Sequence, residues 1–450
     1  MENLDNSAHI RLIPAPASRS LLMFPFISRV IPQDALNLVG LTKLLIALML
    51  SFRLQESILQ LGLIQISTSP LRYPFSLINK LADIYWLPAA AFLFIVTHGI
   101  ITSKHKPKVW VEPPSVLFRF AAIIFGIMLV INLMEAPADL SSQYSSILLT
   151  EGVPIVFMLL CLRDHQGMRL LLGAMAFWSV TTTVIYFLFR VSPLSVSKLS
   201  TMEGRLALGD NEITTGIQFF LSALSSIMAA LVLKERGKKL YMGILLTSAT
   251  YLILCGLLSG SRGPIVAFFF CICIFCIVKY KFNKKLIIPL LLLCCLLLFV
   301  YVFASKIGVF SERVSIRNLA SETRMFNLTS ALSSMPTLFG RGVGGFRQYI
   351  ANDIYIHNCL VESYYEHGIL GLILYVTTVS GALIVLLKRH RFFSDIPSML
   401  PLLFFIFYII ESQFSGTLYS YMPLWALFIY AAIPLTIEKR LVNRDVSQGS

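Results

Sequence analysis

The chain has 450 residues, of which 56% are hydrophobic and only 13% are charged, and its mean hydropathy is +0.77. An ordinary soluble domain is much less apolar, so this composition excludes one and implies a lipid bilayer as the solvent. The long apolar runs also exclude an outer-membrane barrel, because barrel strands alternate at period two over about ten residues.

The apolar runs predict an all-α polytopic membrane protein with about twelve transmembrane helices. A spanning helix needs roughly 20 mostly apolar residues, and helices satisfy their own backbone hydrogen bonds in lipid. Residues 1–33 precede the first run and are predicted to be a cytoplasmic leader that is retained. The expected spans are 34–51, 84–102, 115–133, 146–162, 169–189, 214–233, 240–258, 264–279, 286–304, 366–387, 398–412 and 420–437.

Positively charged residues gather in every second connecting loop along the chain. Short loops on the cytoplasmic side accumulate Lys and Arg, so the alternation predicts that both termini are cytoplasmic. The net charge of +14 is therefore mostly topological, and nucleic acid is not an expected partner. The positively charged loops and tail are 104–108, 163–169, 234–239, 279–285, 388–391 and 439–444.

The other loops are then predicted to be external. The longest of these segments is 305–365, which separates the block of spans 34–304 from the block 366–437, with a tail at 438–450. It contains polar stretches that favour helices, a Gly-rich turn and a histidine. Long ordered loops are usually functional, so we expect this helical loop to carry catalytic elements.

Cysteines and histidines give no metal-site pattern. All eight cysteines lie in or beside apolar segments, which indicates core thiols. His357 and His367 are the two histidines predicted to be external, and their spacing suits no common zinc ligand pair. We therefore predict no metal and no other cofactor.

Arginines stand out on the external side because the charge rule predicts few of them there. Arg262 lies in Ser-Gly-Ser-Arg-Gly (259–263), a short turn between two apolar helices at the membrane boundary. Arginine is well shaped to bind a phosphate with two hydrogen bonds, but a snorkelling anchor is the alternative. The external arginines are Arg190, Arg205, Arg262, Arg313, Arg317, Arg324, Arg341 and Arg347.

Arg205 and Arg324 are further candidates in the same layer. Arg205 precedes the sixth span, and Arg324 lies on a predicted helix of the long loop. A surface ion pair with Glu203 or Glu322 explains each of these arginines equally well.

Gly340-Arg-Gly-Val-Gly-Gly345 matches G-x-G-x-x-G by letter. A dinucleotide site also needs a preceding strand in a βαβ unit, which this loop does not offer. We interpret the glycines as a tight turn whose backbone N–H groups are open to an anion.

His357 lies where the long loop returns to the membrane, ahead of Glu362 and Glu366 at helical spacing. A neutral imidazole can accept a proton from a hydroxyl in a transfer reaction. A structural hydrogen-bonding role is the alternative for a single histidine at a helix start.

The stretch from His357 to Gly371 resembles the motif of the O-antigen polymerase and O-antigen ligase superfamily. The motif is His, then Asn, Ser or Gln, nine further residues, Gly, two residues, and Gly, Thr or Val. The Arg262 turn, Arg205, the Arg324 helix and the glycines at 340–345 follow in the family's order. The resemblance covers about residues 200–390.

The resemblance implies a metal-independent, inverting glycosyltransferase of the GT-C kind. Its donor would be an oligosaccharide linked to undecaprenyl diphosphate, used at the periplasmic face of the bacterial inner membrane. Arg205 and Arg262 would hold the diphosphate, and His357 would orient or deprotonate the acceptor hydroxyl. We place Arg324, Arg341, Asn358 and Glu362 at the substrate.

The family contains polymerases, whose acceptor is a second lipid-linked repeat unit, and ligases, whose acceptor is the lipid A core. The short segment between Arg324 and His357 favours a polymerase, with a chain-length regulator protein as a further partner. A polysaccharide transporter or flippase is the alternative from another class, and such folds often pair discontinuous helices in two related halves. We find no such pairing in the sequence.

Overall fold

The structure is a computed structural model that describes residues 38–54, 108–111, 114–191, 212–259, 261–280, 323–334, 337–346, 356–414, 416–419, 421–433 and 435–438. The predicted leader, the spans at 84–102 and 286–304, and the tail from 439 lie outside these residues. So do Arg205, Arg313, Arg317 and Arg347, as well as the side chains of Arg190 and Arg324.

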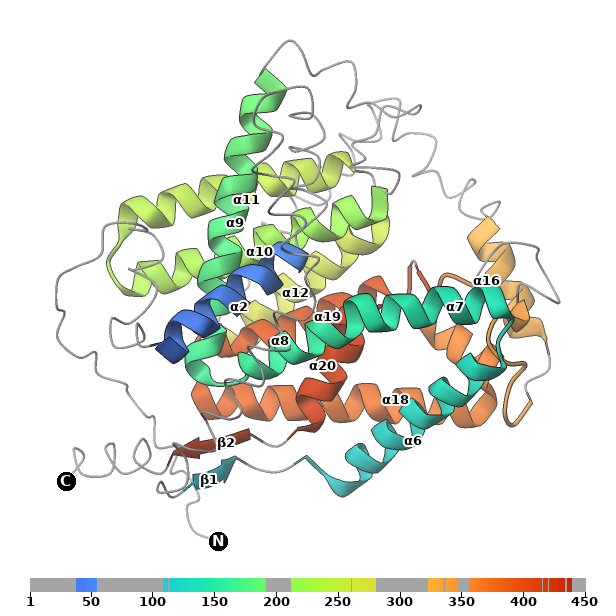
Figure 1. Cartoon of the computed structure of the whole chain (residues 1–450). Coiled ribbons are helices and arrows are strands. Elements are labelled where there is room, and N and C mark those ends of the chain that lie inside the picture. The colour runs from blue at the N-terminus through green and yellow to red at the C-terminus, as the bar shows by residue number, and fades with distance from the viewer. Residues whose placement is uncertain are drawn as a thin grey trace, which may run out of the picture.

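The described residues are almost entirely helical, as the apolar runs predict (Figure 1). The helices of the first part of the chain are α2 (Leu38–Leu54), α6 (Val116–Glu135), α7 (Ala138–Ile147), the π-helical segment η3 (Leu148–Gly152), α8 (Val153–Cys161) and α9 (His165–Val191). The helices of the second part are α10 (Glu212–Glu235), α11 (Lys239–Leu258), α12 (Arg262–Tyr280), α16 (Thr323–Ser333), α18 (Cys359–Phe393), η4 (Pro397–Met399), α19 (Leu400–Glu411) and α20 (Met422–Ala432).

Five of the described helices are long and apolar enough to cross a membrane: α6, α10, α11, α12 and α18. Helix α18 has 35 residues, more than the roughly 20 that a bilayer requires, so one end extends beyond the hydrocarbon region. Shorter apolar helices lie at Gly40–Ser51, Pro397–Glu411 and Met422–Ala432. The total of twelve spans and the GT-C-like arrangement stay predictions.

Helix α10 is the most buried of the five, with 83% of its apolar 18-residue stretch buried inside the protein. It packs against α9, α11 and α12, where Phe220 meets Phe268 with ring centroids 5.1 Å apart. On α11, a side chain at Gly256 would meet the Phe220 ring at 2.8 Å. Small residues of this kind let helices approach closely in a membrane, where packing replaces the hydrophobic driving force.

A two-stranded antiparallel sheet is the exception to the helical pattern in the described residues. Strand β1 (Lys108–Val111) pairs with β2 (Leu435–Glu438) in the register Lys108↔Glu438 to Val111↔Leu435. The sequence prediction had continued the last helix to residue 437, but α20 ends at Ala432. Arg389 of α18 caps this helix end, donating hydrogen bonds to the carbonyl oxygens of Tyr430, Ala431 and Ile433.

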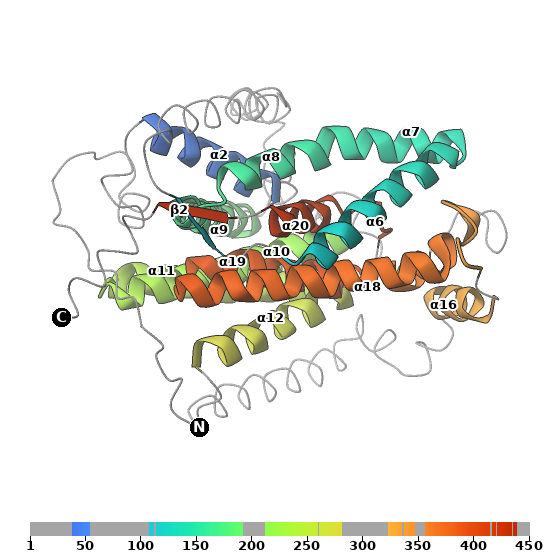
Figure 2. The ribbon, with the colours of Figure 1, turned by 90° about the horizontal axis from the view of Figure 1, so that it is seen from below.

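The described parts of the segments with predicted cytoplasmic charge contact one another at one end of the helices. There β1 pairs with β2, and Lys279 at the end of α12 forms an ion pair of 2.8 Å with Glu235 at the end of α10. Figure 2 shows β2 near one end of α18 and α16 near the other. The Lys279–Glu235 ion pair agrees with the alternation of charge, since it joins two segments that the charge rule predicts on the same side. The pairing of Lys108 with Glu438, the first residue of the predicted cytoplasmic tail, agrees with it too.

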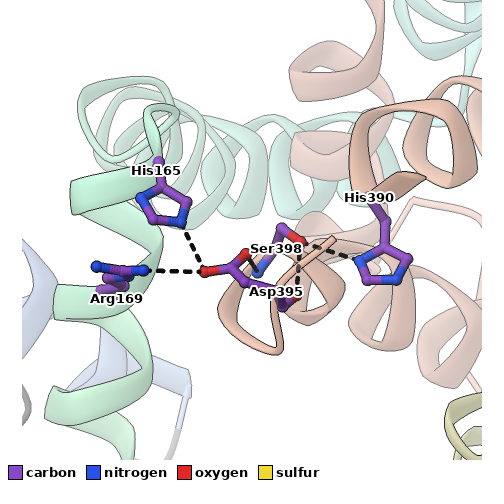
Figure 3. Close-up of polar contacts among 5 residues, drawn as sticks. All are labelled: His165, Arg169, His390, Asp395 and Ser398. Atoms are coloured by element: carbon purple, nitrogen blue, oxygen red, sulfur yellow. Dashed lines mark hydrogen bonds and ion pairs between the residues drawn. The ribbon is translucent and has the colours of Figure 1, made fainter. Parts of the chain in front are cut away.

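Asp395 ties the α18–α19 loop to the start of α9 at this end (Figure 3). Its Oδ2 lies 2.6 Å from His165 Nε2 and 3.5 Å from Arg169, and its Oδ1 accepts a hydrogen bond of 3.2 Å from the Ser398 amide. Ser398 Oγ is in turn 2.9 Å from His390 Nδ1. Figure 3 shows Asp395 between the two α9 side chains and the Ser398–His390 pair.

The pKa of Asp395 predicts a pH-dependent contribution to stability. Burial acts to raise this pKa, but the hydrogen bond and charge of His165, with Ser398 and Arg169, lower it below its ordinary value. The stability from Asp395 is therefore present above the unfolded pKa of about 3.9 and is lost as the pH falls through the folded pKa. At pH 7 Asp395→Asn is expected to cost about 1.5–3 kcal/mol of unfolding free energy.

Thermal unfolding of the two proteins across pH 7 to 3 tests this expectation, because the difference should shrink toward the acidic end. Glu235→Gln is the matched control. It breaks the more exposed pair with Lys279, whose loss should cost within about 0.5 kcal/mol. A difference between wild type and Asp395→Asn that stays constant down to pH 3 would contradict the role of the charge.

Candidate functional site

Helix α18 is broken near its amino-terminal end, and the break organises the candidate site. Gly368 adopts φ 70° and ψ −167°, outside the helical region, so residues 359–367 and 369–393 form two helical pieces. Each piece leaves backbone groups open at the break, because helix ends lack intrahelical partners. In or near a bilayer such groups need other partners.

The Gly-rich segment 337–346, called the glycine loop from here on, supplies these partners. The amides of Arg341 and Gly342 donate to the carbonyls of Tyr365 and Glu366 at 3.1 and 2.9 Å. On the other side of the break, the amides of Ile369 and Leu370 donate to the carbonyls of Thr337 and Leu338, both at 3.2 Å. The glycine loop thus closes both open helix ends.

The glycines are required for this close backbone contact. Gly340 has φ 81°, and a Cβ there would lie 2.2 Å from the Glu366 carbonyl oxygen. The tight turn predicted from the sequence is present, with Gly340, Gly342 and Gly344 all at positive φ. The expectation that its N–H groups are open to an anion is wrong for Arg341, Gly342 and Gly344, because these three amides bind α18.

His357 lies two residues before the first residue of α18 and has φ 60°, an unusual conformation for a residue with a side chain. The next residue, Asn358, is the helix N-cap, and its Oδ1 accepts from the Val361 amide at 2.9 Å. Its Nδ2 donates to the Gln413 carbonyl at 3.2 Å. Asn358 therefore fixes the start of the helix, and with it the position of His357.

The turn Glu411–Phe414 at the end of α19, called the α19 turn from here on, contacts two of the predicted motifs. On one side the Cys359 amide donates to the Ser412 carbonyl at 3.1 Å, next to His357. On the other side a Cβ at Gly263 would lie 2.8 Å from Phe414 Cβ and 3.5 Å from a carboxyl oxygen of Glu411. The α19 turn therefore lies between the Arg262 turn and the His357 segment and contacts both.

Arg262 is the first residue of α12 and is partly buried. The start of α10 packs against its turn, since a Cβ at Gly216 would lie 2.9 Å from Ser259 Oγ and 3.1 Å from Ser261 Cβ. The resemblance places Arg205 ahead of this helix start, outside the described residues.

Helix α16 carries Arg324 in its first turn and packs beside the start of α18. A small core joins Leu328 and Ala331 of α16 to four residues of the glycine loop and the α18 start. These four residues are Phe346, Ile356, Val361 and Tyr365. The guanidinium of Arg341 lies over the Tyr365 ring, 5.5 Å from its centroid.

A buried polar network that the sequence did not predict joins α18 to α6 and to the turn before α20. His367 is fully buried, and its Nδ1 accepts a hydrogen bond from the side-chain amide of Asn132. The ring proton is then on Nε2, which lies 3.0 Å from the Tyr419 hydroxyl. Tyr419 stacks on Tyr144 of α7 with a centroid distance of 5.1 Å. In the sequence, the only sign of this network is the helical spacing of the polar residues that follow His357.

Tyr419 keeps its proton in this setting. Burial raises the pKa of its hydroxyl well above the ordinary value of about 10, and the nearby Glu366 and Glu362 raise it further. It therefore acts as a hydrogen-bonding group at neutral pH.

The apolar helices and the polar site at one end of α18 define a polytopic helical membrane protein. Residues 246–376 match the family model described as O-Antigen ligase. The matched segment includes the Arg262 turn, α16, the glycine loop and the His357 segment. It confirms the predicted resemblance to the O-antigen polymerase and ligase superfamily. Searches of curated proteins and of solved structures gave no match.

Proposed function

We propose that this protein is an inverting, metal-independent glycosyltransferase that works at the periplasmic face of the bacterial inner membrane. Its donor is a glycan linked to undecaprenyl diphosphate, and its acceptor is a saccharide hydroxyl. The observation that carries the proposal is the α19 turn, which contacts both the Arg262 turn and the start of α18 next to His357. The contact of one turn with two motifs that are far apart in the sequence supports a shared site.

The proposed chemistry follows from charge. The leaving group is a lipid diphosphate, whose negative charge grows as the glycosidic bond breaks, and fixed arginines can stabilise it. Arg262 would do so from the first turn of α12, where the helix dipole adds positive potential. Arg205 would assist it, and His357 would orient or deprotonate the acceptor hydroxyl. Arg324, Arg341 and Asn358 would lie on the substrate side.

Polymerisation of lipid-linked repeat units is the reaction that we favour, in agreement with the short segment between Arg324 and His357. A chain-length regulator would then be a partner. Transfer to the lipid A core is the second candidate, because the matched family is described by its ligase activity.

Glycan profiling of cells that lack the native gene distinguishes the two reactions. A polymerase defect leaves a single repeat unit on the lipid A core, since ligation still works. A ligase defect leaves polymer on undecaprenyl diphosphate and a bare core. Complementation with the wild-type gene should restore the full profile.

An unchanged glycan profile in the deletion strain, with no other copy of the activity in the cell, would contradict the proposed function. Restoration by His357→Ala at wild-type levels of membrane protein would contradict the role of His357. A general base in this position is worth about 10²–10⁴-fold in rate.

A further inference from the structure

Glu366 binds the glycine loop twice. Its side chain is 5% exposed, and its Oε1 accepts a hydrogen bond of 2.9 Å from the Gly344 amide. Its own carbonyl accepts a second one, also 2.9 Å long, from the Gly342 amide. On its other side, Gly344 lies against Leu140 of α7, because a Cβ there would be 2.5 Å from a Leu140 methyl group. Gly344 is thus held between α7 and α18.

Glu362 lies one helical turn earlier on the same face of α18 and binds a different segment. It is 3% exposed, and its Oε2 accepts a hydrogen bond of 2.7 Å from the Leu418 amide. Leu418 is fully buried, and the residue after it, Tyr419, reaches His367. The carboxyl group of Glu362 therefore fixes the turn between α19 and α20.

We infer that Glu362 and Glu366 are positioning residues, which hold the α19–α20 turn and the glycine loop in place around the start of α18, next to His357. This differs from the direct substrate contact expected for Glu362 from the sequence. Both carboxyl groups are buried, and one oxygen of each already accepts a hydrogen bond from a backbone amide, so neither group is exposed to a saccharide. The inference rests on the proposed function only for its effect on glycan transfer.

Side-chain replacements separate positioning from substrate contact. Leucine at either position removes the acceptor and leaves a buried amide without a partner, which is costly. Glutamine keeps an oxygen at the same place and can accept the same hydrogen bond. A positioning role therefore tolerates glutamine, whereas recognition of a substrate by a charged carboxylate does not.

Limited proteolysis reads the position of the glycine loop without any activity assay. The Arg341 side chain is exposed, while its backbone is hydrogen-bonded to α18, so the site is accessible but held. In the purified full-length protein we expect Glu366→Leu to accelerate trypsin cleavage after Arg341 at least tenfold. Glu366→Gln should be cleaved at the wild-type rate. Arg341→Gln lacks the cleavage site, so the fragment that is missing from its digest is the product of cleavage after Arg341.

Glu362→Leu is the matched control for proteolysis. It removes a buried carboxyl group from the same helix face but leaves the Gly344 hydrogen bond intact, so cleavage after Arg341 should stay at the wild-type rate. Equal cleavage of Glu366→Leu and wild type would overturn the inference. Acceleration by Glu366→Gln to the rate of the leucine variant would also overturn it.

Hydrogen exchange of the wild type provides a second measurement if Glu366→Leu does not fold. The Gly342 and Gly344 amides are expected to exchange at least tenfold more slowly than a free peptide. Exchange of both amides at the free-peptide rate would overturn the inference.

Glycan transfer supplies the functional readout. Both glutamine variants should retain activity within about threefold of wild type, and both leucine variants should lose at least tenfold in kcat. Loss of activity in the glutamine variants, with wild-type proteolysis, would mean that the carboxyl groups act on the substrate, and would overturn the inference. If the proteolysis results are as expected but the wild type transfers no glycan, the proposed function fails and the positioning of the loop stands.

Discussion

Replacing Arg262 with alanine is expected to lower the rate of glycan transfer by about 10²–10³-fold, with little change in the amount of folded protein. The guanidinium lies at the start of α12, and the proposed donor develops negative charge on its diphosphate as the bond to the sugar breaks. Losing a fixed positive group at that point removes stabilisation from the transition state. A transfer assay on purified protein with a lipid-linked donor measures the effect.

Two further variants make the result for Arg262 specific. Arg262→Lys keeps the charge but loses the planar pair of hydrogen bonds, so its rate should fall between wild type and alanine. Arg391→Ala removes an exposed arginine near the opposite end of α18 and should leave the rate unchanged. A rate for Arg262→Ala within twofold of wild type would show that this residue does not hold the donor.

Gly368→Ala is expected to destabilise the protein by about 2–5 kcal/mol and to abolish transfer. The combination of φ 70° and ψ −167° costs a residue with a side chain about 1–3 kcal/mol. The added Cβ would also lie 2.4 Å from the Gly340 nitrogen and from the Thr337 and Leu338 carbonyl oxygens. These are backbone atoms of the glycine loop, and they can move away only by breaking the hydrogen bonds that close the helix ends.

Thermal unfolding in detergent measures the stability of Gly368→Ala. Gly126→Ala on α6 is the matched control, because a Cβ there meets no atom within 4 Å. In a regular helix this substitution should be neutral or stabilise by about 0.5–1 kcal/mol. Equal unfolding temperatures for the two alanine variants would contradict the tight contact at the α18 break.

Hydropathy predicted several helices of the bundle closely because burial in lipid is a local property of a sequence. The expected span at 240–258 corresponds to α11 at Lys239–Leu258, and the one at 115–133 corresponds to α6 at Val116–Glu135. Helix α7 was missed. Its sequence, ADLSSQYSSI, is polar and was predicted as an external loop, but packing of Leu140 on Gly344 and of Tyr144 on Tyr419 holds it in a helix.

The candidate site was predictable where function is carried by a local motif, and not where it depends on contacts between distant segments. The sequence predicted a helix start at His357 and a turn at Gly340–Gly345, and both are present. It could not predict that the turn docks on α18, because backbone hydrogen bonds leave no side-chain pattern. Nor could it pair His367 with Asn132, since these residues are 235 positions apart and belong to separate helices.

The two-stranded sheet has a consequence for the order in which the protein assembles. Val111 emerges from the ribosome long before its partner Leu435 exists. At a synthesis rate of about 5–20 residues per second, β2 is made on the order of tens of seconds after β1. The helices between the strands have been synthesised by then, so the β1–β2 ladder closes late during biogenesis. In the sequence, β1 and β2 flank most of the helices of the bundle, so their pairing marks a nearly complete fold.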